Sequence, residues 1–347
     1  MSGADRAGDK VSGADRAGDG MPGAETAGAE TTGAETAGGE TAGGEMSVLL
    51  TSPQRTSTTL LMSEAAARRG MEVRVLDGPP EALAPGRSGH HWYGGPLLAD
   101  RIALPFGLGL LEPADAWLAD LPEEFTARRV VLTTLAEARA SLRRPAFVKP
   151  PGDKSFPPAV YADGGRLAEG MPGRLPPDTA VLVSDVVSFA SEFRLFALDG
   201  RIVTGSRYAV YGRLDPGPLP AGARRFGERL LAAAGESLPS AVAVDIGLVT
   251  DMDTGRDRWA VVEANMPWFA HSYAAEPDRV LDVVLRAAGP LRHVTERDRR
   301  FLRPRRSEVR AVVPAGGIRE ESGTAPARCR GSAPGSDVPC ERRPGNG

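Results

Sequence analysis

Residues 146–265 alternate short apolar runs with turn residues, and this pattern most strongly limits what the chain can fold into. Asp199-Gly200 lies between two alternating runs, which is the strongest short-range signal for a β-hairpin. A second pair of runs, at 241–250 and 257–266, predicts another hairpin. This half of the chain is therefore expected to contain antiparallel sheet.

The part before it predicts a small parallel α/β lobe. Residues 47–52 and 71–78 are apolar runs typical of strands, and residues 56–70 between them have helical spacing and end in glycine. A strand–helix–strand order makes the two strands parallel. Residues 85–128 are rich in proline and glycine, and one helix is expected there. Further helices are predicted at 133–142, 222–237 and 276–290.

Both ends of the chain are expected to be disordered. Residues 1–45 repeat a near-decapeptide and carry nine acids against three bases, with no aromatic residue to bury. We interpret this stretch as an acidic leader, and Met46 is an alternative start of the native protein. Residues 293–347 form a predicted basic tail rich in Arg and Pro, with twelve Arg against seven acids from residue 294 onward.

Composition excludes several classes of protein. The net charge of −3 provides no global basic field for nucleic acid, although the tail is a candidate contact for RNA or an acidic partner. Both cysteines, Cys329 and Cys340, lie in the tail, so the folded part has no disulfide framework. No run is long enough to span a membrane, and the leader lacks a signal-peptide core. We therefore expect a soluble cytoplasmic protein of unspecified oligomeric state.

Two acids in the second hairpin are expected to lie side by side. If its loop centres on Thr254, Asp245 pairs with Glu263, and directly opposed like charges destabilise a sheet. A magnesium ion between them would resolve the conflict, because Mg²⁺ prefers oxygen ligands. Small residues at Ala243 and Gly247 leave room for it. The alternative is a register shifted by one residue, with both acids facing solvent.

Side-chain alternation adds a third candidate ligand to this face. Trp259, Val261, Glu263 and Asn265 are spaced two apart and are expected on one side of their strand. Asn265 would then contribute an amide oxygen beside Glu263.

The first hairpin provides a second polar group. Pairing about Asp199-Gly200 sets Arg194 opposite Gly205 and Glu192 opposite Arg207, so that Glu192, Arg194 and Arg207 share a face. This group would hold hydroxyls with its carboxylate and anionic oxygens with its guanidiniums. The alternative is an exposed cross-strand ion pair of about 0.2–1 kcal/mol.

The segment "FVKPPGDKSF" provides a third candidate site. Lys149 ends a strand, and Lys154 and Ser155 follow in a loop of the kind that covers phosphates with backbone amides. The spacing is not that of a Walker A loop. The alternative is that Lys149 is a solvated strand end.

These segments occur in one order along the chain: the lysine strand, its loop, "VLVSDVV", "SEFRLF", "VDIG" and "VVEANMP". In this the sequence resembles the ATP-grasp superfamily over about residues 125–290, and more narrowly a clade in which arginine replaces one of the usual phosphate-binding lysines. The resemblance implies an α+β fold, with an α/β lobe at 46–125 and an ATP-grasp domain at 126–292 whose two subdomains clamp ATP.

The resemblance also implies roles for single residues. Those holding Mg²⁺ on the ATP phosphates are Asp245, Glu263 and Asn265. Those contacting ATP are Lys149 and the loop residues Lys154 and Ser155 at the phosphates, the hinge residues Asp185, Val186 and Val187 at adenine, and Glu192 at the ribose. Those acting on phosphate or acyl-phosphate oxygens are Arg194 and Arg207, with Arg128 or Arg129 as a further basic residue. The arginine that the family often has at the position of Ala243 is missing.

The implied activity is that of an ATP- and Mg²⁺-dependent ligase. Such enzymes activate a carboxylate as an acyl phosphate, which an amine or a thiol then attacks. The substrates would be small-molecule or peptide carboxylates and amines, with the segment 90–95 and His271 as candidate acceptor contacts or packed structural residues. Two alternatives stay open: a nucleotide-binding protein without catalysis, and an interaction protein whose charged tails bind partners.

Overall fold

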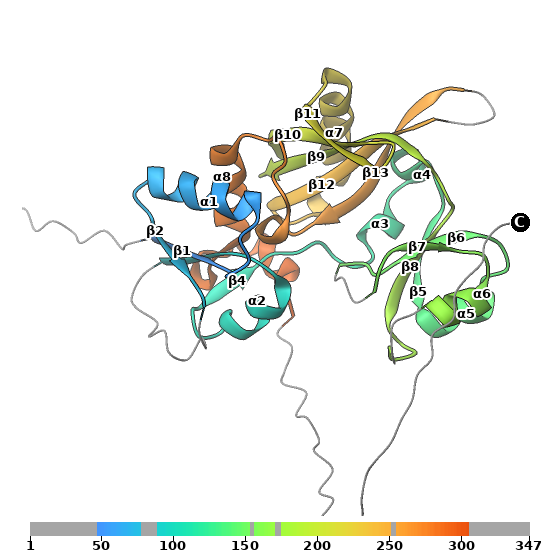
Figure 1. The fold of residues 1–347 in the computed structure, drawn as a ribbon, viewed down its shortest axis with the longest axis horizontal. Coiled ribbons are helices and arrows are strands. Elements are labelled where there is room, and N and C mark those ends of the chain that lie inside the picture. Colours follow the sequence, from blue (N-terminus) through green and yellow to red (C-terminus); the bar gives the residue numbers. More distant parts are fainter. Residues whose placement is uncertain (1–46, 78–88, 153–155, 171–174, 251–254, 305–347) are drawn as a thin grey trace, which may run out of the picture. The chain divides into compact units, whose positions relative to one another are not determined.

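Four β-sheets organise the part of the chain that the computed structural model describes, which is residues 47–77, 89–152, 156–170, 175–250 and 255–304 (Figure 1). All of these residues belong to one compact unit, Met46–Gly347. The predicted leader, and with it the alternative start, lies outside the described residues. None of the described helices is long and apolar enough to cross a lipid bilayer.

The first sheet is the parallel α/β lobe that the sequence predicts. Its strands are in the order β2-β1-β3, and both neighbours run parallel to β1. Helix α1 begins after Thr56, whose side chain accepts a hydrogen bond of 3.0 Å from the backbone N–H of Thr59. The elements are β1 (Ser47–Thr51), α1 (Ser57–Arg68), β2 (Glu72–Val75) and β3 (Gly89–Tyr93).

Strand β3 was not expected, because its two histidines interrupt the apolar pattern. The segment "HHWY", taken as a loop or an acceptor contact, instead forms this strand, with Trp92 fully buried and His90 4% exposed. The structure therefore favours the packed alternative for this segment. The lobe is completed by α2 (Pro96–Ile102) and by a two-stranded sheet of β4 (Leu108–Leu110) and β14 (Ala288–Pro290).

A four-stranded antiparallel sheet follows, with the order β5-β8-β6-β7. Helices α5 and α6 pack on one face through Leu135 and Leu167, which share a core with Val148 and Val181. Thr134 and Glu137 form a capping box that begins α5. The elements are β5 (Val130–Thr134), α5 (Leu135–Ser141), β6 (Ala146–Lys149), β7 (Ala159–Tyr161), α6 (Gly164–Gly170) and β8 (Ala180–Ser184).

The largest sheet has five antiparallel strands in the order β11-β10-β9-β12-β13. Helix α7 packs on one face and α8 on the other, because alternate residues of β9 and β12 belong to two different cores. Asp199 and Gly200 both have positive φ, as a tight hairpin turn requires, which confirms the predicted β9–β10 hairpin. The elements are β9 (Phe189–Leu198), β10 (Arg201–Val210), β11 (Arg213–Pro218), α7 (Ala221–Ala234), β12 (Ala241–Thr250), β13 (Asp257–Asn265) and α8 (Pro277–Ala287).

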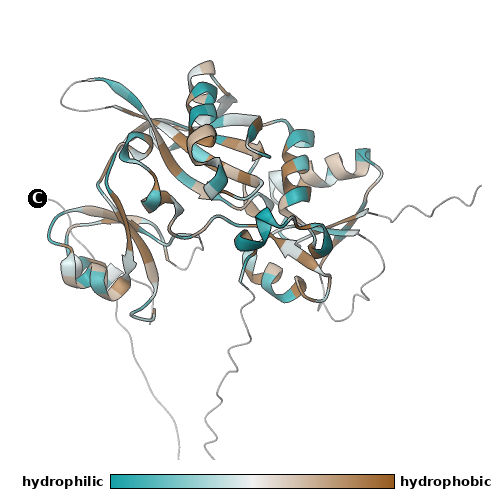
Figure 2. Cartoon of the chain, turned by 180° about the vertical axis from the view of Figure 1, so that it is seen from behind, coloured by the Kyte–Doolittle hydropathy of each residue, from teal (hydrophilic) through white to brown (hydrophobic). Residues whose placement is uncertain are grey.

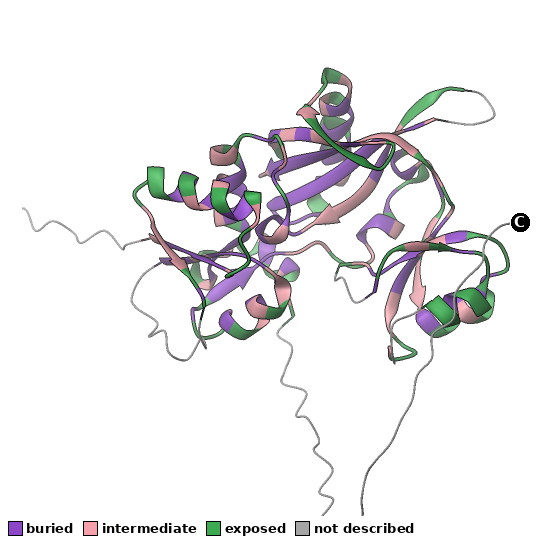
Figure 3. Ribbon diagram, viewed as in Figure 1, coloured by how far each residue is buried: buried purple, intermediate pink, exposed green. Residues whose placement is uncertain are grey.

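Short helices complete the unit. They are α3 (Trp117–Asp120), α4 (Glu123–Thr126) and the 3-10 helices Gly235–Ser237, Pro267–Phe269, Leu291–His293 and Arg297–Phe301. Hydrophobic residues are concentrated in the central strands of the large sheet, and the helices carry hydrophilic residues on their outer faces (Figure 2). Strands β9 and β12 are buried along most of their length, whereas β11 is exposed at the edge (Figure 3).

The predicted tail is wrong for its first residues. Asp298 is 1% exposed and accepts hydrogen bonds from the backbone N–H and the hydroxyl of Ser240, at 2.8 and 2.6 Å. Phe301 is buried against the core of the α/β lobe. Residues 293–304 are therefore part of the fold, and the rest of the predicted tail lies outside the described residues.

Candidate nucleotide and metal site

A row of charged side chains crosses three adjacent strands of the large sheet. Arg194 on β9 pairs with Asp245 on β12, and Asp245 pairs in turn with Glu263 on β13. The predicted pairing of Asp245 with Glu263 is thus confirmed. The row places one cation and two carboxylates side by side on the same face of the sheet.

A β-bulge in β13 brings Glu263 onto this face. Ile246 pairs with Val261 while its neighbour Asp245 pairs with Glu263, so Val262 is an extra residue. Alternation is broken there: Val261 and Trp259 pack in the core beneath α7, whereas Glu263 and Asn265 face the other way. The expectation that all four share one face is therefore wrong for Trp259 and Val261.

Arg128 stabilises the bulge from a segment distant in the sequence. Its guanidinium donates to the carbonyl oxygens of Val261 at 2.8 Å and Val262 at 3.3 Å. Burial lowers the pKa of Arg128 to about 10, against the raising effect of Asp185 and Glu263. Of the two candidate arginines, Arg128 is the buried one and Arg129 is exposed.

Asp245 is bound to Arg194 through both carboxylate oxygens. The Nε and Nη2 atoms of Arg194 donate at 2.7 Å each, and Arg194 and Asp245 are 8% and 1% exposed. Burial lowers the pKa of Arg194, but the Asp245 carboxylate raises it above its ordinary value overall, so the guanidinium stays charged. The buried acid is thus neutralised by the chain itself.

Glu263 is neutralised by a second cation, from the small sheet. Lys149 at the end of β6 donates to Glu263 Oε2, and the amide of Asn265 donates to Glu263 Oε1 at 2.9 Å and to Asp245 Oδ2 at 3.2 Å. Burial raises the pKa of Glu263, but the charge and hydrogen bond of Lys149 lower it below its ordinary value overall. Lys149 is 8% exposed, so it is not a solvated strand end.

The donor set fits a hard divalent cation. One amide nitrogen lies within 3.2 Å of both carboxylates, so Asp245, Glu263 and Asn265 converge on one point, and all three carry oxygen ligands. No three His, Cys, Asp or Glu side chains in the described residues could hold a metal, so Asn265 is needed as a ligand. Since Arg194 and Lys149 already balance the two acids, their pairing does not require a cation.

The first hairpin has a different register from the predicted one. Arg194 pairs with Ser206 and Glu192 with Ala209, because irregularities at Val203 and Tyr208 shift the ladder. Arg207 pairs with Phe193 and donates to Asp215 on β11, at 3.0 Å to its carbonyl and 3.1 Å to its carboxylate. The structure therefore does not bring Arg207 to the row of charges.

Tyr208 takes the place expected for Arg207. Its hydroxyl donates to Glu192 Oε2 at 2.8 Å, and its ring stacks on Tyr273 with 4.9 Å between centroids. The guanidinium of Arg194 lies 5.7 Å from the Tyr208 ring and 5.2 Å from the Tyr273 ring. Burial raises the pKa of Glu192, and the nearby charges of Asp245 and Glu263 act in the same direction.

Tyr273 itself was missed by sequence reasoning. Its φ of 50° is unusual for a bulky residue, and nothing in the sequence signals it. Its neighbours Ser272 and His271 contact Thr58 at the start of α1, through a backbone N–H at 3.1 Å and a ring nitrogen at 3.3 Å. The segment thus joins the α/β lobe to the row of charges, with His271 in a structural role.

A cavity of about 280 Å³ lies beside the row, between the two larger sheets. The predicted hinge residues Asp185, Val186 and Val187 line it, together with Glu192 and Lys149. Its walls are largely apolar, from Val130, Phe147, Val160, Leu182 and Phe189. We call it the hinge cavity.

The hinge presents backbone groups to this cavity. The Asp185 carboxylate accepts from Arg129 N–H and from Arg144, both at 3.1 Å. In the described part of the chain, no hydrogen bond is found to the backbone of Val186 or Val187. Gly247 is needed beside the cavity, since a Cβ there would lie 2.4 Å from Phe189, so the glycine makes room for a cavity wall and not for an ion.

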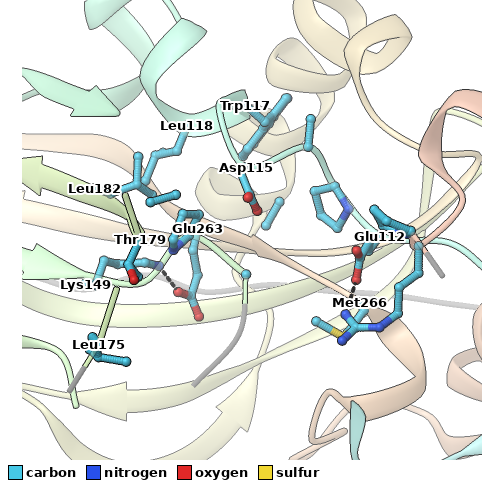
Figure 4. Close-up of a pocket in the computed structure, with 18 of the residues that line it drawn as sticks. Glu112, Asp115, Trp117, Leu118, Lys149, Leu175, Thr179, Leu182, Glu263 and Met266 are labelled. Atoms are coloured by element: carbon cyan, nitrogen blue, oxygen red, sulfur yellow. Dashed lines mark hydrogen bonds and ion pairs between the residues drawn. The ribbon is translucent and has the colours of Figure 1, made fainter. Parts of the chain in front are cut away.

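A second cavity, of about 470 Å³, opens on the other side of the Lys149–Glu263 pair (Figure 4). Lys149, Glu263, Leu118 and Leu182 line both cavities. We call this one the linker cavity, because residues 112–118, which connect the α/β lobe to the small sheet, form one wall. The predicted loop residues Lys154 and Ser155 lie outside the described residues.

The comparisons with known proteins agree with the resemblance. Residues 125–283, a little under half of the chain, match the sequence model of an ATP-grasp domain, the second family of its clade. This match supports the ATP-grasp superfamily and the α+β ATP-grasp fold. The replacement of a lysine by arginine stays a prediction. No curated protein matches the sequence.

Solved structures with a similar course of the chain include three ATP-grasp proteins or ligases. A RimK domain protein ATP-grasp from Sphaerobacter thermophilus is 20% identical, with a TM-score of 0.42 over 69% of this chain and 100% of that one. D-alanine–D-alanine ligase from Bacillus anthracis is 12% identical, with 0.40 over 70% and 97%. The macrocyclase MdnC from Microcystis aeruginosa, bound with its precursor peptide MdnA, is 11% identical, with 0.42 over 69% and 99%.

Proposed function

We propose that this chain is an ATP- and Mg²⁺-dependent ligase that activates a carboxylate as an acyl phosphate for attack by an amine or a thiol. One observation carries the proposal: Lys149, Glu263, Asn265, Asp245 and Arg194 form a continuous hydrogen-bonded row that borders the hinge cavity. Alternating cations and oxygen donors are what a triphosphate with its metal needs. The family match over residues 125–283 supports the same class of reaction.

The side chains have distinct tasks in this proposal. The apolar walls of the hinge cavity hold adenine, the backbone groups of Val186 and Val187 hydrogen-bond its edge, and Glu192 accepts from ribose hydroxyls. Lys149 reaches across from the small sheet to bind phosphate oxygens. Arg194, held rigidly by Asp245 and two tyrosine rings, provides a fixed positive charge near the transferred group.

Asp245, Glu263 and Asn265 would hold the magnesium ion. When bound, Mg²⁺ neutralises charge on the phosphoryl oxygens. The protein residues do the positioning and require no covalent chemistry of their own. Arg207 has no task in this scheme, since it is bound to Asp215 on the far strand.

A binding-only protein is the second candidate, and one observation favours it. Both oxygens of Asp245 already accept hydrogen bonds from Arg194, so this acid is less available to a metal than Glu263. A protein that binds ATP through the hinge cavity without transferring phosphate would have this arrangement. The third alternative, an interaction protein acting through its tails, predicts no binding of ATP at all.

A single screen separates the three candidates. Purified protein is given Mg·ATP with panels of carboxylates and amines, and ADP release is followed by a coupled assay. The proposed ligase releases ADP only when a suitable carboxylate is present, and the variant Glu263→Gln does not. ATP-dependent stabilisation without ADP release for any pair indicates the binding-only protein, and no stabilisation contradicts both.

A further inference from the structure

The linker cavity differs from the hinge cavity in its charge. It has an ion pair at each end: Lys149 with Glu263 at one, and Glu112 with Arg303 at the other, as Figure 4 shows for the labelled Lys149, Glu263 and Glu112. Asp115 and Trp117 lie along the wall between them. Its volume of about 470 Å³ suits a small molecule.

Arg303 is already committed to the chain's own acids. Its Nε and Nη2 donate to the two oxygens of Asp100 at 2.6 and 3.2 Å, and its Nη1 donates to Glu112 Oε2 at 2.6 Å. The side chains of Arg303, Asp100 and Glu112 are 11%, 18% and 20% exposed. This group of two acids and one base therefore has an excess negative charge and no spare cation for an anionic ligand.

The remaining charges of the cavity point the same way. The charged side chains on its lining are Glu112, Asp115, Glu263, Lys149 and Arg303. Lys149 is balanced by Glu263, and Arg303 is outnumbered by Asp100 and Glu112. The Arg303 end of the cavity is therefore anionic. Leu118, Leu182 and Met266 provide apolar surface between the two ends.

We propose that the linker cavity binds the substrate of the ligase, and that this substrate carries a protonated amine on an apolar stem. The ammonium group lies against Glu112, the stem lies along Leu118 and Leu182, and the other end reaches the Lys149–Glu263 pair, where the nucleotide phosphates end. Glu112 is then the residue that determines specificity. This inference rests on the proposed function, because it uses the phosphate end of the hinge cavity as the reacting end.

Three probes with one stem and different head groups test the charge. n-Pentylamine, n-pentanol and n-pentanoate are titrated into the full chain, with binding followed by ligand-observed NMR. We expect the amine to bind at least about tenfold more tightly than the alcohol, as a hydrogen-bonded charge pair would provide, and the carboxylate to bind most weakly. Equal binding of amine and carboxylate, or no preference for the amine, overturns the inference.

Two variants and one control locate the site. Glu112→Gln keeps the size of the side chain and is expected to lower amine affinity about tenfold while leaving pentanol unchanged. Glu169→Gln, at an exposed glutamate paired with Arg166 on α6, is the matched control and should change neither. Ala180→Leu fills the cavity without altering charge and should weaken both probes. It keeps the test valid if Glu112→Gln does not fold. Unchanged amine binding in both pocket variants overturns the inference.

Nucleotide serves to separate this inference from the proposed function. ADP at saturation should leave the amine affinity within about twofold, because the two ligands occupy different cavities. Direct competition overturns the inference. If the wild type fails to bind Mg·ATP, the proposed function itself fails. If Mg·ATP binds and ADP is released while pentylamine shows no selectivity, only the substrate assignment fails.

Discussion

Arg194 and Asp245 face each other across β9 and β12 and are joined by two hydrogen bonds of 2.7 Å. Both side chains are buried, and the guanidinium also lies close to the rings of Tyr208 and Tyr273. The pair is therefore fixed in one geometry before any ligand arrives. Removing one partner leaves an isolated charge in a buried place, whereas removing both does not.

The first prediction concerns the stability of this pair. Asp245→Asn is expected to lower the free energy of unfolding by about 3–5 kcal/mol, because it leaves the guanidinium of Arg194 buried and uncompensated. The double variant Arg194→Met, Asp245→Leu should be more stable than Asp245→Asn alone. Urea unfolding of the three proteins measures both values. Equal stabilities of wild type and Asp245→Asn would contradict the importance of the pair.

The second prediction concerns turnover. Glu263→Gln and Asp245→Asn are both expected to abolish ATP turnover while the fold survives, since each removes an anionic ligand of the proposed metal. Glu263→Gln is the cleaner test, because Glu263 is partly exposed, unlike Asp245. In a thermal-shift titration it should remove the stabilisation that depends on Mg²⁺ and keep that from nucleotide alone. Wild-type ADP release by both variants would refute the metal assignment.

The third prediction concerns ribose recognition. Glu192 lines the hinge cavity and is oriented by the hydroxyl of Tyr208. The wild type is expected to bind ATP about tenfold more tightly than 2′,3′-dideoxy-ATP, because only ATP has hydroxyls to donate to the carboxylate. Glu192→Ala should reduce this preference nearly to one. Measured dissociation constants decide it, and an undiminished preference in the variant would move ribose recognition elsewhere.

The fourth prediction is a pH dependence. The pKa of Glu263 is lowered in the folded state, against the effect of burial, by Lys149. The ionised form therefore stabilises the fold, fully so above the ordinary glutamate value of about 4.3, and this contribution is lost as the pH falls through the lower folded pKa. Glu263→Gln lacks it. Unfolding free energies between about pH 3 and 7 should fall more steeply for wild type than for the variant. Parallel curves would contradict the assignment.

The pairing of Asp245 with Glu263 could be predicted from the sequence, but for an incomplete reason. The loop centre at Thr254 gives the correct partner only because the bulge at Val262 restores a register that is shifted elsewhere in the hairpin. Counting residues cannot reveal a bulge, since Arg128 binds its carbonyls from a distant segment. In the other hairpin the same uncertainty exchanged Tyr208 for Arg207.

Elements with long-range partners were also beyond the sequence. Strand β3 is polar in its first residues, yet its place next to β1 in a parallel sheet buries it. Residues 297–301 have the composition of a charged tail, but Asp298 has its hydrogen-bond partner at Ser240. The helices, the Asp199-Gly200 turn and the lobe order could be predicted because each depends on neighbours within a few residues.

The extra residue in β13 has a consequence for protein engineering. Deleting Val262 would restore regular alternation and turn the carboxylate and the amide toward the apolar layer beneath α7, so activity and stability would be lost together. Anyone who transplants this strand, or aligns it with a shorter relative, must therefore carry the insertion along with the acids it orients.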